Sequence, residues 1–268
     1  MERIKQALEK AREQRQGQQP AATPRATAQQ APGAPDQISY HQTRNLKVPR
    51  EALRRNRILG GVDDKSFVES FKILRTQVLQ RLRENDWNVL AVTSPDEDAG
   101  KTVTAINLAA SLAMEISYTV LLVDADLRHP DMLQHLGLPP AKGLADYLLD
   151  DVPVPDLLVK PDAFEHVVIL PGGRPVAHSA ELLNSPKMAD LVEELKTRYP
   201  RRIVIFDLPP VLSAADALAF APYVDAALLV IEDGGTKQED LQRAVELLDC
   251  TNIIGTVLNK AAGTSAGY

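Results

Sequence analysis

The chain has little of what stabilises small secreted proteins or anchors proteins in membranes. Its 268 residues include a single cysteine, Cys250, so no disulfide framework is available and a reducing cytosol fits. The five histidines show no metal-ligand spacing with cysteine or acidic residues. No uninterrupted apolar run approaches the length of a membrane-spanning helix, and the charged start MERIKQALEKAREQRQ is unlike a signal peptide. The composition therefore disfavours a secreted disulfide scaffold and an integral membrane protein.

Charge is distributed unevenly along the chain. The net charge is -6, but residues 1–60 hold 12 Lys and Arg against 5 Asp and Glu, whereas residues 61–268 hold 18 against 31. A basic tail on an acidic body suggests a negative partner, such as a lipid surface or an acidic protein segment. A solvated tail that keeps the protein soluble is the alternative, and both interpretations remain open. We expect no nucleic acid as partner.

Four segments follow from the sequence pattern. Residues 1–16 place apolar side chains on one stripe and predict a short basic amphipathic helix. Residues 17–62 begin with a stretch rich in Gln, Ala and Pro, which predicts a disordered linker followed by a lead-in. Residues 63–262 form the expected domain, and residues 263–268 a flexible tail with Tyr268. Four apolar residues of the lead-in are expected to lie against the domain: Leu46, Val48, Leu53 and Ile58.

Apolar strands alternate with helical patterns from residue 63 onward. Strands are predicted at residues 88–94, 118–124, 166–170, 202–207, 225–231 and 252–258, and helices at 64–84, 101–116, 186–198, 214–221 and 237–248. This alternation predicts an α/β fold with a mostly parallel sheet and helices on both faces. In such sheets, ligands bind beyond the carboxyl ends of the strands.

The stretch SPDEDAGKT, residues 94–102, lies between the first long strand and its helix. A phosphate loop needs a tight turn whose N–H groups and following helix N-terminus face the phosphates. The lysine then reaches the terminal phosphates and the hydroxyl holds Mg²⁺. Gly100, Lys101 and Thr102 supply these last roles, although Pro95, Asp96, Glu97 and Asp98 replace the usual glycines. The predicted nucleotide contacts are Asp98, Ala99, Gly100, Lys101, Thr102 and Val103.

Carboxylates end two further strands. Asp124 and Asp126 follow one strand, and Asp207 ends the run RIVIFD before two prolines. Beside a nucleotide, such carboxylates bind Mg²⁺ or accept a proton from an attacking hydroxyl. Helix capping and turn formation are the alternatives. The three strand ends together indicate a P-loop NTPase-like fold that binds ATP and Mg²⁺.

Several motifs resemble the bacterial tyrosine kinases of capsule and exopolysaccharide synthesis, a deviant-Walker-A group related to the partition ATPases. VLLVDADLRHP resembles that family's Walker A′ box, RIVIFDLPPVL its Walker B box, and LPGGRPVAHSAELLNSP its proline-containing loop. ESFKILRTQV resembles the helix through which the family forms rings, and MERIKQALEKAR resembles members whose membrane activator is a separate chain.

The resemblance implies a tyrosine autokinase that regulates the chain length, polymerisation or export of an exopolysaccharide. Lys101, Asp124 and Asp126 would be catalytic, and the metal contacts would be Thr102, Asp124 and Asp207. Glu69, Lys72 and Arg75 would lie at a subunit interface, with lysine replacing the first arginine of that motif. Tyr268 would be the phosphate acceptor in a neighbouring subunit. A transmembrane polysaccharide co-polymerase would activate the chain, which would be cytoplasmic and reach the inner face of the membrane through this partner.

Two other functions remain open. A regulatory ATP-binding subunit with little or no kinase activity is favoured by Asp98 in the loop and by the single tail tyrosine. A membrane-cycling ATPase of the partitioning type would need an additional lysine near the start of the loop, and residues 85–99 contain neither Lys nor Arg. Asn259, after the last strand, is a candidate contact for the nucleotide base.

Overall fold

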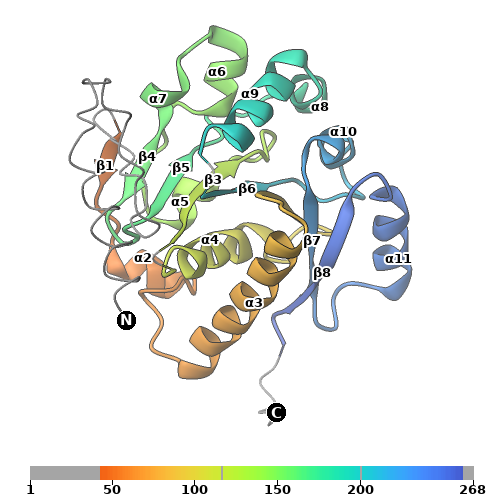
Figure 1. The fold of residues 1–268 in the computed structure, drawn as a ribbon. Coiled ribbons are helices and arrows are strands. Elements are labelled where there is room, and N and C mark those ends of the chain that lie inside the picture. The colour runs from red at the N-terminus through yellow and green to blue at the C-terminus, as the bar shows by residue number, and fades with distance from the viewer. Residues whose placement is uncertain (1–42, 116, 200, 262–268) are drawn as a thin grey trace, which may run out of the picture. The chain divides into compact units, whose positions relative to one another are not determined.

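An eight-stranded sheet forms the centre of the protein (Figure 1). The computed structural model describes residues 43–115, 117–199 and 201–261. The strand order is β1-β4-β5-β3-β6-β2-β7-β8, and the pairings are parallel except for β4 with β5. The strands are β1 Arg44–Leu46, β2 Val89–Thr93, β3 Thr119–Asp124, β4 Val159–Pro161, β5 Val167–Leu170, β6 Arg202–Asp207, β7 Ala226–Glu232 and β8 Asn252–Asn259.

Helices cover both faces of the sheet, as the alternating pattern predicts. One face packs against α2 Arg50–Arg55, α3 Lys65–Glu84, α4 Lys101–Leu112 and α5 Met132–His135. The other packs against α6 Leu144–Asp150, α7 Val154–Leu157, α8 Ser179–Leu183, α9 Pro186–Thr197, α10 Asp216–Phe220 and α11 Gln238–Leu247. A 3₁₀ turn, Ala221–Tyr223, follows α10. The predicted α/β fold with a mostly parallel sheet is thereby confirmed.

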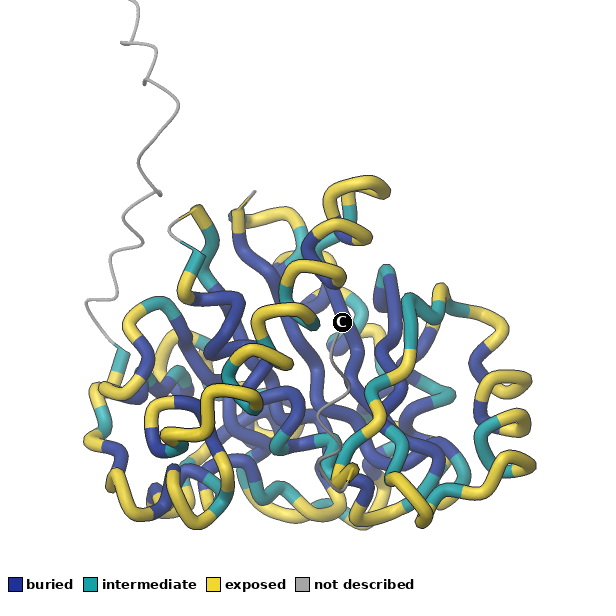
Figure 2. Tube along the Cα trace, turned by 90° about the horizontal axis from the view of Figure 1, so that it is seen from below, coloured by how far each residue is buried: buried dark blue, intermediate teal, exposed yellow. Residues whose placement is uncertain are grey.

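Residues along each central strand alternate between the two faces. On β2, Leu90 and Val92 face the side of α3 and α4, whereas Val89 and Ala91 face the side of α9 and α10. Because both faces are covered, every residue of β2 is buried, and its sequence reads as an unbroken apolar run. Figure 2 shows these central strands buried and the outer surfaces of the surrounding helices exposed.

Residues 43–62, which precede the predicted start of the domain, form part of it. Val48, Leu53 and Ile58 are buried in the core, and Leu46 packs against it. Asn107 of α4 accepts a hydrogen bond from the Leu59 N–H at 2.7 Å and donates one to the Arg57 carbonyl at 3.0 Å. The compact domain therefore begins well before residue 63, the boundary expected from composition, because these apolar side chains are buried against α3 and α4.

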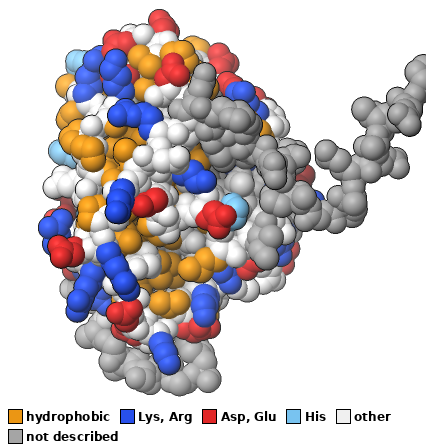
Figure 3. All heavy atoms as spheres, turned by 90° about the vertical axis from the view of Figure 1, so that its left-hand side faces the viewer, with side chains coloured by type: hydrophobic (Ala, Val, Ile, Leu, Met, Phe, Trp, Pro, Cys, Tyr) orange, Lys and Arg blue, Asp and Glu red, His pale blue; other side chains and the backbone are white. Residues whose placement is uncertain are grey.

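The surface around β1 carries mixed charges. Figure 3 shows basic, acidic and apolar side chains interspersed on this side of the molecule. Within the described ranges, no helix has the length and apolarity that crossing a bilayer requires. The predicted N-terminal helix at 1–16, the linker from residue 17 to 42, and the tail with Tyr268 lie outside the described residues.

Candidate nucleotide-binding and phosphoryl-transfer site

The loop between β2 and α4 is anchored to the segment that follows β6. The Thr93 hydroxyl donates to the Pro209 carbonyl at 2.7 Å, and the Val211 N–H donates to the Ser94 carbonyl at 2.8 Å. The Leu212 N–H donates to the Pro95 carbonyl at 3.1 Å. Because β2 and β6 pair directly, these bonds hold the loop beside the carboxyl end of β6, where Asp207 stands.

Two residues of the loop adopt left-handed backbone conformations. Asp98 has φ +58° and an exposed side chain, and Gly100 has φ +87°. A Cβ at Gly100 would lie 2.2 Å from Asn259 Nδ2, which itself donates to the Ala99 carbonyl at 2.8 Å. Glycine is therefore favoured at position 100 by its left-handed backbone conformation and by the closeness of Asn259, whereas Asp98 adopts a conformation that aspartate tolerates better than most residues. Asn259, expected at the base of the nucleotide, is here a partner of the loop backbone.

Lys101 and Thr102 open α4 at the end of this loop. Lys101 Nζ lies 2.9 Å from Asp126 Oδ2, and both side chains are largely buried. Burial disfavours the charged amine, but the negative charges of Asp207 and Asp126 outweigh it and raise the pKa of Lys101. Lys101 is thus held as a cation against Asp126. Thr102 is buried in the same turn, and Val103 follows it on α4, half-buried.

Asp124 and Asp207 stand opposite each other in the register of β3 and β6. Asp124 Oδ2 accepts the Met132 N–H at 3.3 Å, but Oδ1 has no hydrogen-bond partner within the described residues. Burial, together with the charge of Asp207, raises the pKa of Asp124 well above its usual range. A buried carboxyl with one oxygen that no described group contacts is placed to bind a cation or to accept a hydrogen bond from a substrate hydroxyl.

Asp207 is fully buried, and within the described part of the chain neither of its oxygens accepts a well-formed hydrogen bond. Burial raises its pKa to about 6, against the opposing effects of the Lys101 charge and the nearby Thr102 hydroxyl. When it is ionised, Asp207 therefore carries a negative charge that no described protein group neutralises fully. Uncompensated carboxylates of this kind, with a neighbouring hydroxyl, are suitable ligands for a hard divalent cation.

The described residues contain no preformed cluster of three or more His, Cys, Asp or Glu with metal-binding geometry. This finding does not conflict with the donors present, since Mg²⁺ is usually bound through one or two carboxylates plus the phosphates of its substrate. The structure thus brings together four residues from three separate strand ends that the sequence pointed to: Lys101, Asp124, Asp126 and Asp207.

The three residues expected at a subunit interface lie on α3. Lys72 Nζ pairs with Glu69 Oε2 at 3.0 Å, and both side chains are exposed. Arg75 instead turns toward α4, where it donates to the Ser111 carbonyl at 3.1 Å and pairs with Glu115 at 3.2 Å. Two nitrogens of its guanidinium are therefore paired within its own chain.

One ion pair near the site has no clear signal in the sequence. Arg128 Nε lies 3.0 Å from Asp216 Oδ2, and Asp216 is fully buried at the start of α10. The pair joins the segment after Asp126 to the segment after Asp207. The two residues lie 88 positions apart along the chain, and neither belongs to the predicted site.

Comparisons with known proteins also indicate a nucleotide-binding domain. The sequence model of the CobQ/CobB/MinD/ParA nucleotide binding domain family matches residues 90–267. The succinoglycan biosynthesis transport protein ExoP of Rhizobium meliloti (strain 1021) is 34% identical over 214 residues, which cover 77% of this chain and 26% of ExoP. The tyrosine-protein kinase YwqD of Bacillus subtilis (strain 168) is 32% identical over 218 residues, which cover 78% of this chain and 90% of YwqD. The chain thus spans about a quarter of ExoP but most of YwqD.

A solved structure extends the likeness to three dimensions. The kinase domain of the Escherichia coli tyrosine kinase ETK matches with a TM-score of 0.70 at 27% identity, covering 77% of this chain and 81% of that one.

Proposed function

The chain belongs to the bacterial tyrosine-protein kinases built on the CobQ/CobB/MinD/ParA nucleotide-binding domain, and we propose that it transfers the terminal phosphate of ATP to tyrosine. The observation that carries the proposal is the convergence of Lys101, Asp124, Asp126 and Asp207 at the carboxyl edge of the sheet, beside the loop that ends in Gly100. A role in the synthesis of an exopolysaccharide or capsule is supported by the relative that is named a succinoglycan biosynthesis transport protein.

Each group of residues would have a different role in phosphoryl transfer. Backbone N–H groups of residues 98–103 and the N-terminus of α4 would hold the phosphates, and Lys101 would neutralise charge that develops on the transferred group. Thr102, Asp124 and Asp207 would hold Mg²⁺, which when bound supplies positive charge at the phosphate oxygens. Lys101 must leave Asp126 to reach the phosphates, so nucleotide binding exchanges one ion pair for another.

The acceptor and the assembly complete the proposal. Tyr268 would receive the phosphate in a neighbouring copy, in a ring or other homo-oligomer whose contacts include Glu69, Lys72 and Arg75. An exposed Glu69–Lys72 pair is available for such contacts, whereas Arg75 would first have to leave Glu115. We also propose a cytoplasmic protein held near the membrane by a transmembrane polysaccharide co-polymerase that activates it, with indirect membrane contact.

One experiment tests the reaction. Purified protein is incubated with Mg²⁺ and ATP, with and without the cytoplasmic segment of a candidate activator, and phosphotyrosine is mapped by mass spectrometry. Phosphate on Tyr268 in the wild type, and none in Lys101→Met, Asp124→Ala or Tyr268→Phe, would support the proposal. Nucleotide binding without phosphotyrosine under any condition would refute it.

The second candidate function is a nucleotide-binding regulatory subunit without kinase activity, and Asp98 favours it. This exposed carboxylate lies in the loop that would face the phosphates, where negative charge weakens their binding. The same experiment separates the two functions, because the regulatory subunit would change its assembly state with ATP and yield no phosphotyrosine.

A further inference from the structure

The basic excess of the first sixty residues lies mainly in the part of them that is folded. Residues 44–57 hold six of the 12 Lys and Arg and one of the 5 Asp and Glu, which accounts for +5 of the excess of +7. These residues form β1, α2 and the segments beside them, on one side of the sheet (Figure 1). Most of the charge that the composition assigns to a tail therefore belongs to the surface of the domain.

All six of these cations are exposed, and five of them have no partner among the described residues. Arg57 lies over the ring of Phe67, with 5.5 Å from Cζ to the ring centroid. Acidic side chains also occur on this side of the molecule (Figure 3), yet no described one pairs with the other five. Exposed Lys187, by contrast, pairs with Asp151 at 2.5 Å. We call the five unpaired cations the β1–α2 basic surface: Arg44, Lys47, Arg50, Arg54 and Arg55.

The apolar side chains of the same segment point into the domain. On α2, Ala52 and Leu53 are buried, and the exposed positions of the helix are occupied by its three arginines and Glu51. The large apolar side chains that are exposed elsewhere in the described domain include none from residues 44–57. The Val48 N–H donates to Asp162 Oδ1 at 2.8 Å, which fixes the start of the segment against the sheet. The cations are thus carried on a folded support without exposed large apolar neighbours from their own segment.

This composition matches a lipid surface better than a protein or a nucleic acid. Protein interfaces have a core poor in charge, with apolar and aromatic anchors, and residues 44–57 expose no such anchor. They also contain no aromatic residue that could stack on a base. A layer of anionic headgroups needs neither anchors nor a groove, because it attracts each nearby cation separately.

The acidic remainder of the chain does not prevent such binding. Residues 61–268 hold 18 Lys and Arg against 31 Asp and Glu, but charges more than about 8 Å away are largely screened at physiological salt. α11, which contains Glu239, Asp240 and Glu246, lies on the opposite side of the sheet from β1 and α2 (Figure 1). The charge distribution therefore orients the β1–α2 basic surface toward a negative layer and α11 away from it.

We propose that the β1–α2 basic surface binds the anionic headgroups of a lipid bilayer directly, in addition to the indirect contact through a membrane partner. The binding is electrostatic and peripheral, because the segment exposes no large apolar side chain that could enter the acyl region. It requires neither nucleotide nor phosphoryl transfer, so it goes beyond the proposed kinase function and does not depend on it.

Flotation of the full chain with lipid vesicles tests the proposal. Vesicles of equal parts phosphatidylglycerol and phosphatidylcholine should bind the protein, vesicles of phosphatidylcholine alone should not, and binding should be lost at about 1 M salt, where the Debye length is about 3 Å. Replacing Arg50, Arg54 and Arg55 together by glutamine should weaken binding at least about tenfold. Glutamine has nearly the helix propensity of arginine, so the urea midpoint of this variant should stay close to that of the wild type.

Two control variants separate the position of the charge from its amount and from the shape of the side chain. Replacing three exposed arginines on other elements by glutamine removes the same charge and should leave vesicle binding within about twofold of the wild type: Arg81, Arg201 and Arg243. Replacing the three arginines of α2 by lysine keeps the charge without the guanidinium fork, and should preserve binding to a lipid layer.

The outcomes that would overturn the proposal are distinct. A wild type that does not float with anionic vesicles, or a glutamine variant of α2 that binds as tightly as its control, would refute binding at this surface. Retention of the wild type by polyglutamate or by nucleic acid but not by vesicles, with the same three arginines required, would replace the lipid by an acidic macromolecule. Lys101→Met should bind vesicles like the wild type, so failure of the kinase reaction leaves this test unaffected.

Discussion

Removing the charge of Asp207 should stabilise the nucleotide-free protein, although it also removes a proposed metal ligand. Asp207 is fully buried, and neither oxygen has a well-formed hydrogen bond within the described residues. Burial raises its pKa from 3.8 to about 6, and the charge of Asp126 adds to the increase. The ionised form is therefore less stable in the folded chain than in the unfolded one.

The sign of the pH dependence follows from this difference. A carboxyl group with a raised pKa in the folded state binds its proton more tightly there, so its contribution to stability is present below the unfolded pKa and is lost as the pH rises through about 6. A rise from 3.8 to about 6 corresponds to about 3 kcal/mol. Asp207→Asn retains the shape without the charge, and should raise the free energy of unfolding above neutral pH by about 2 kcal/mol, since the amide leaves polar atoms unsatisfied.

Urea unfolding of the nucleotide-free protein at about pH 7.5 measures the effect. Asp225→Asn is the matched control, because the Asp225 side chain is also largely buried but pairs with Lys196 and accepts the N–H groups of Asn88 at 3.1 Å and Val89 at 3.0 Å. Loss of that charge should destabilise the fold by about 1–3 kcal/mol. An Asp207→Asn protein no more stable than the wild type would refute the reasoning.

Addition of Mg²⁺ and ATP should make the wild type more stable than Asp207→Asn, the reverse of the order expected without nucleotide. A ligand that binds only the folded state adds about 2.7 kcal/mol at one hundred times its dissociation constant. The wild type should gain this stabilisation, because bound cation compensates Asp207, whereas Asp207→Asn should gain little. Equal stabilisation of both proteins by MgATP would show that Asp207 is not a ligand of the metal.

Three further predictions concern the phosphate loop. Gly100→Ala should lower the free energy of unfolding, measured in urea, by about 2 kcal/mol, because φ is +87° and the new Cβ would meet the Asn259 side chain. Adding Asn259→Gly to this variant should restore the part of the loss that is due to the clash. Asp98→Gly should change the free energy of unfolding by less than about 1 kcal/mol. It should tighten ATP binding, measured by calorimetry, and this gain in affinity should shrink at high salt. An unchanged affinity would place this carboxylate away from the phosphates. Lys101→Met should abolish phosphotyrosine and weaken ATP binding at least about tenfold, and a variant with wild-type affinity would contradict its contact with the phosphates.

The sequence predicts the central strands well because they are continuous apolar runs. β2 and β6 are covered on both faces, so every residue is buried and the pattern is unambiguous. β1 and β4 have three residues each, with sequences RNL and VKP, and no periodicity separates such short segments from loops. The short helices α2, α5, α6, α7 and α8 were not predicted, since four to seven residues define barely two turns.

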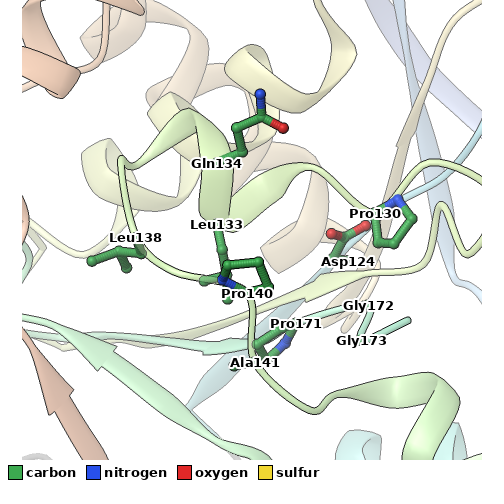
Figure 4. Close-up of a pocket in the computed structure, with 10 residues that line it drawn as sticks. All are labelled: Asp124, Pro130, Leu133, Gln134, Leu138, Pro140, Ala141, Pro171, Gly172 and Gly173. Atoms are coloured by element: carbon green, nitrogen blue, oxygen red, sulfur yellow. The ribbon is translucent and has the colours of Figure 1, made fainter. Parts of the chain in front are cut away.

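The convergence of the carboxylates could be predicted because it depends on topology. In a parallel sheet every strand ends at the same edge, so Asp124 and Asp207 meet whatever their distance along the chain. The Lys101–Asp126 and Arg128–Asp216 pairs could not be predicted, because they depend on where side chains turn after the strand has ended. The pocket beside Asp124 that Figure 4 shows could not be predicted for the same reason, because its walls come from three separate segments, none of which carries a motif of its own.

Compared with a glycine-rich phosphate loop, the loop SPDEDAGKT differs more in its charge than in its backbone shape. Glycine is favoured at position 100 because φ is +87° and a Cβ there would overlap Asn259 Nδ2. At position 98 only the backbone conformation matters, and aspartate reaches φ +58° with its carboxylate exposed. The turn, its anchoring to the segment after β6 and the N-terminus of α4 are therefore all present without glycine at 98. The consequence of Asp98 should appear as a salt-dependent loss of ATP affinity in a correctly folded protein, which distinguishes a weakened kinase from a chain that has lost its nucleotide site.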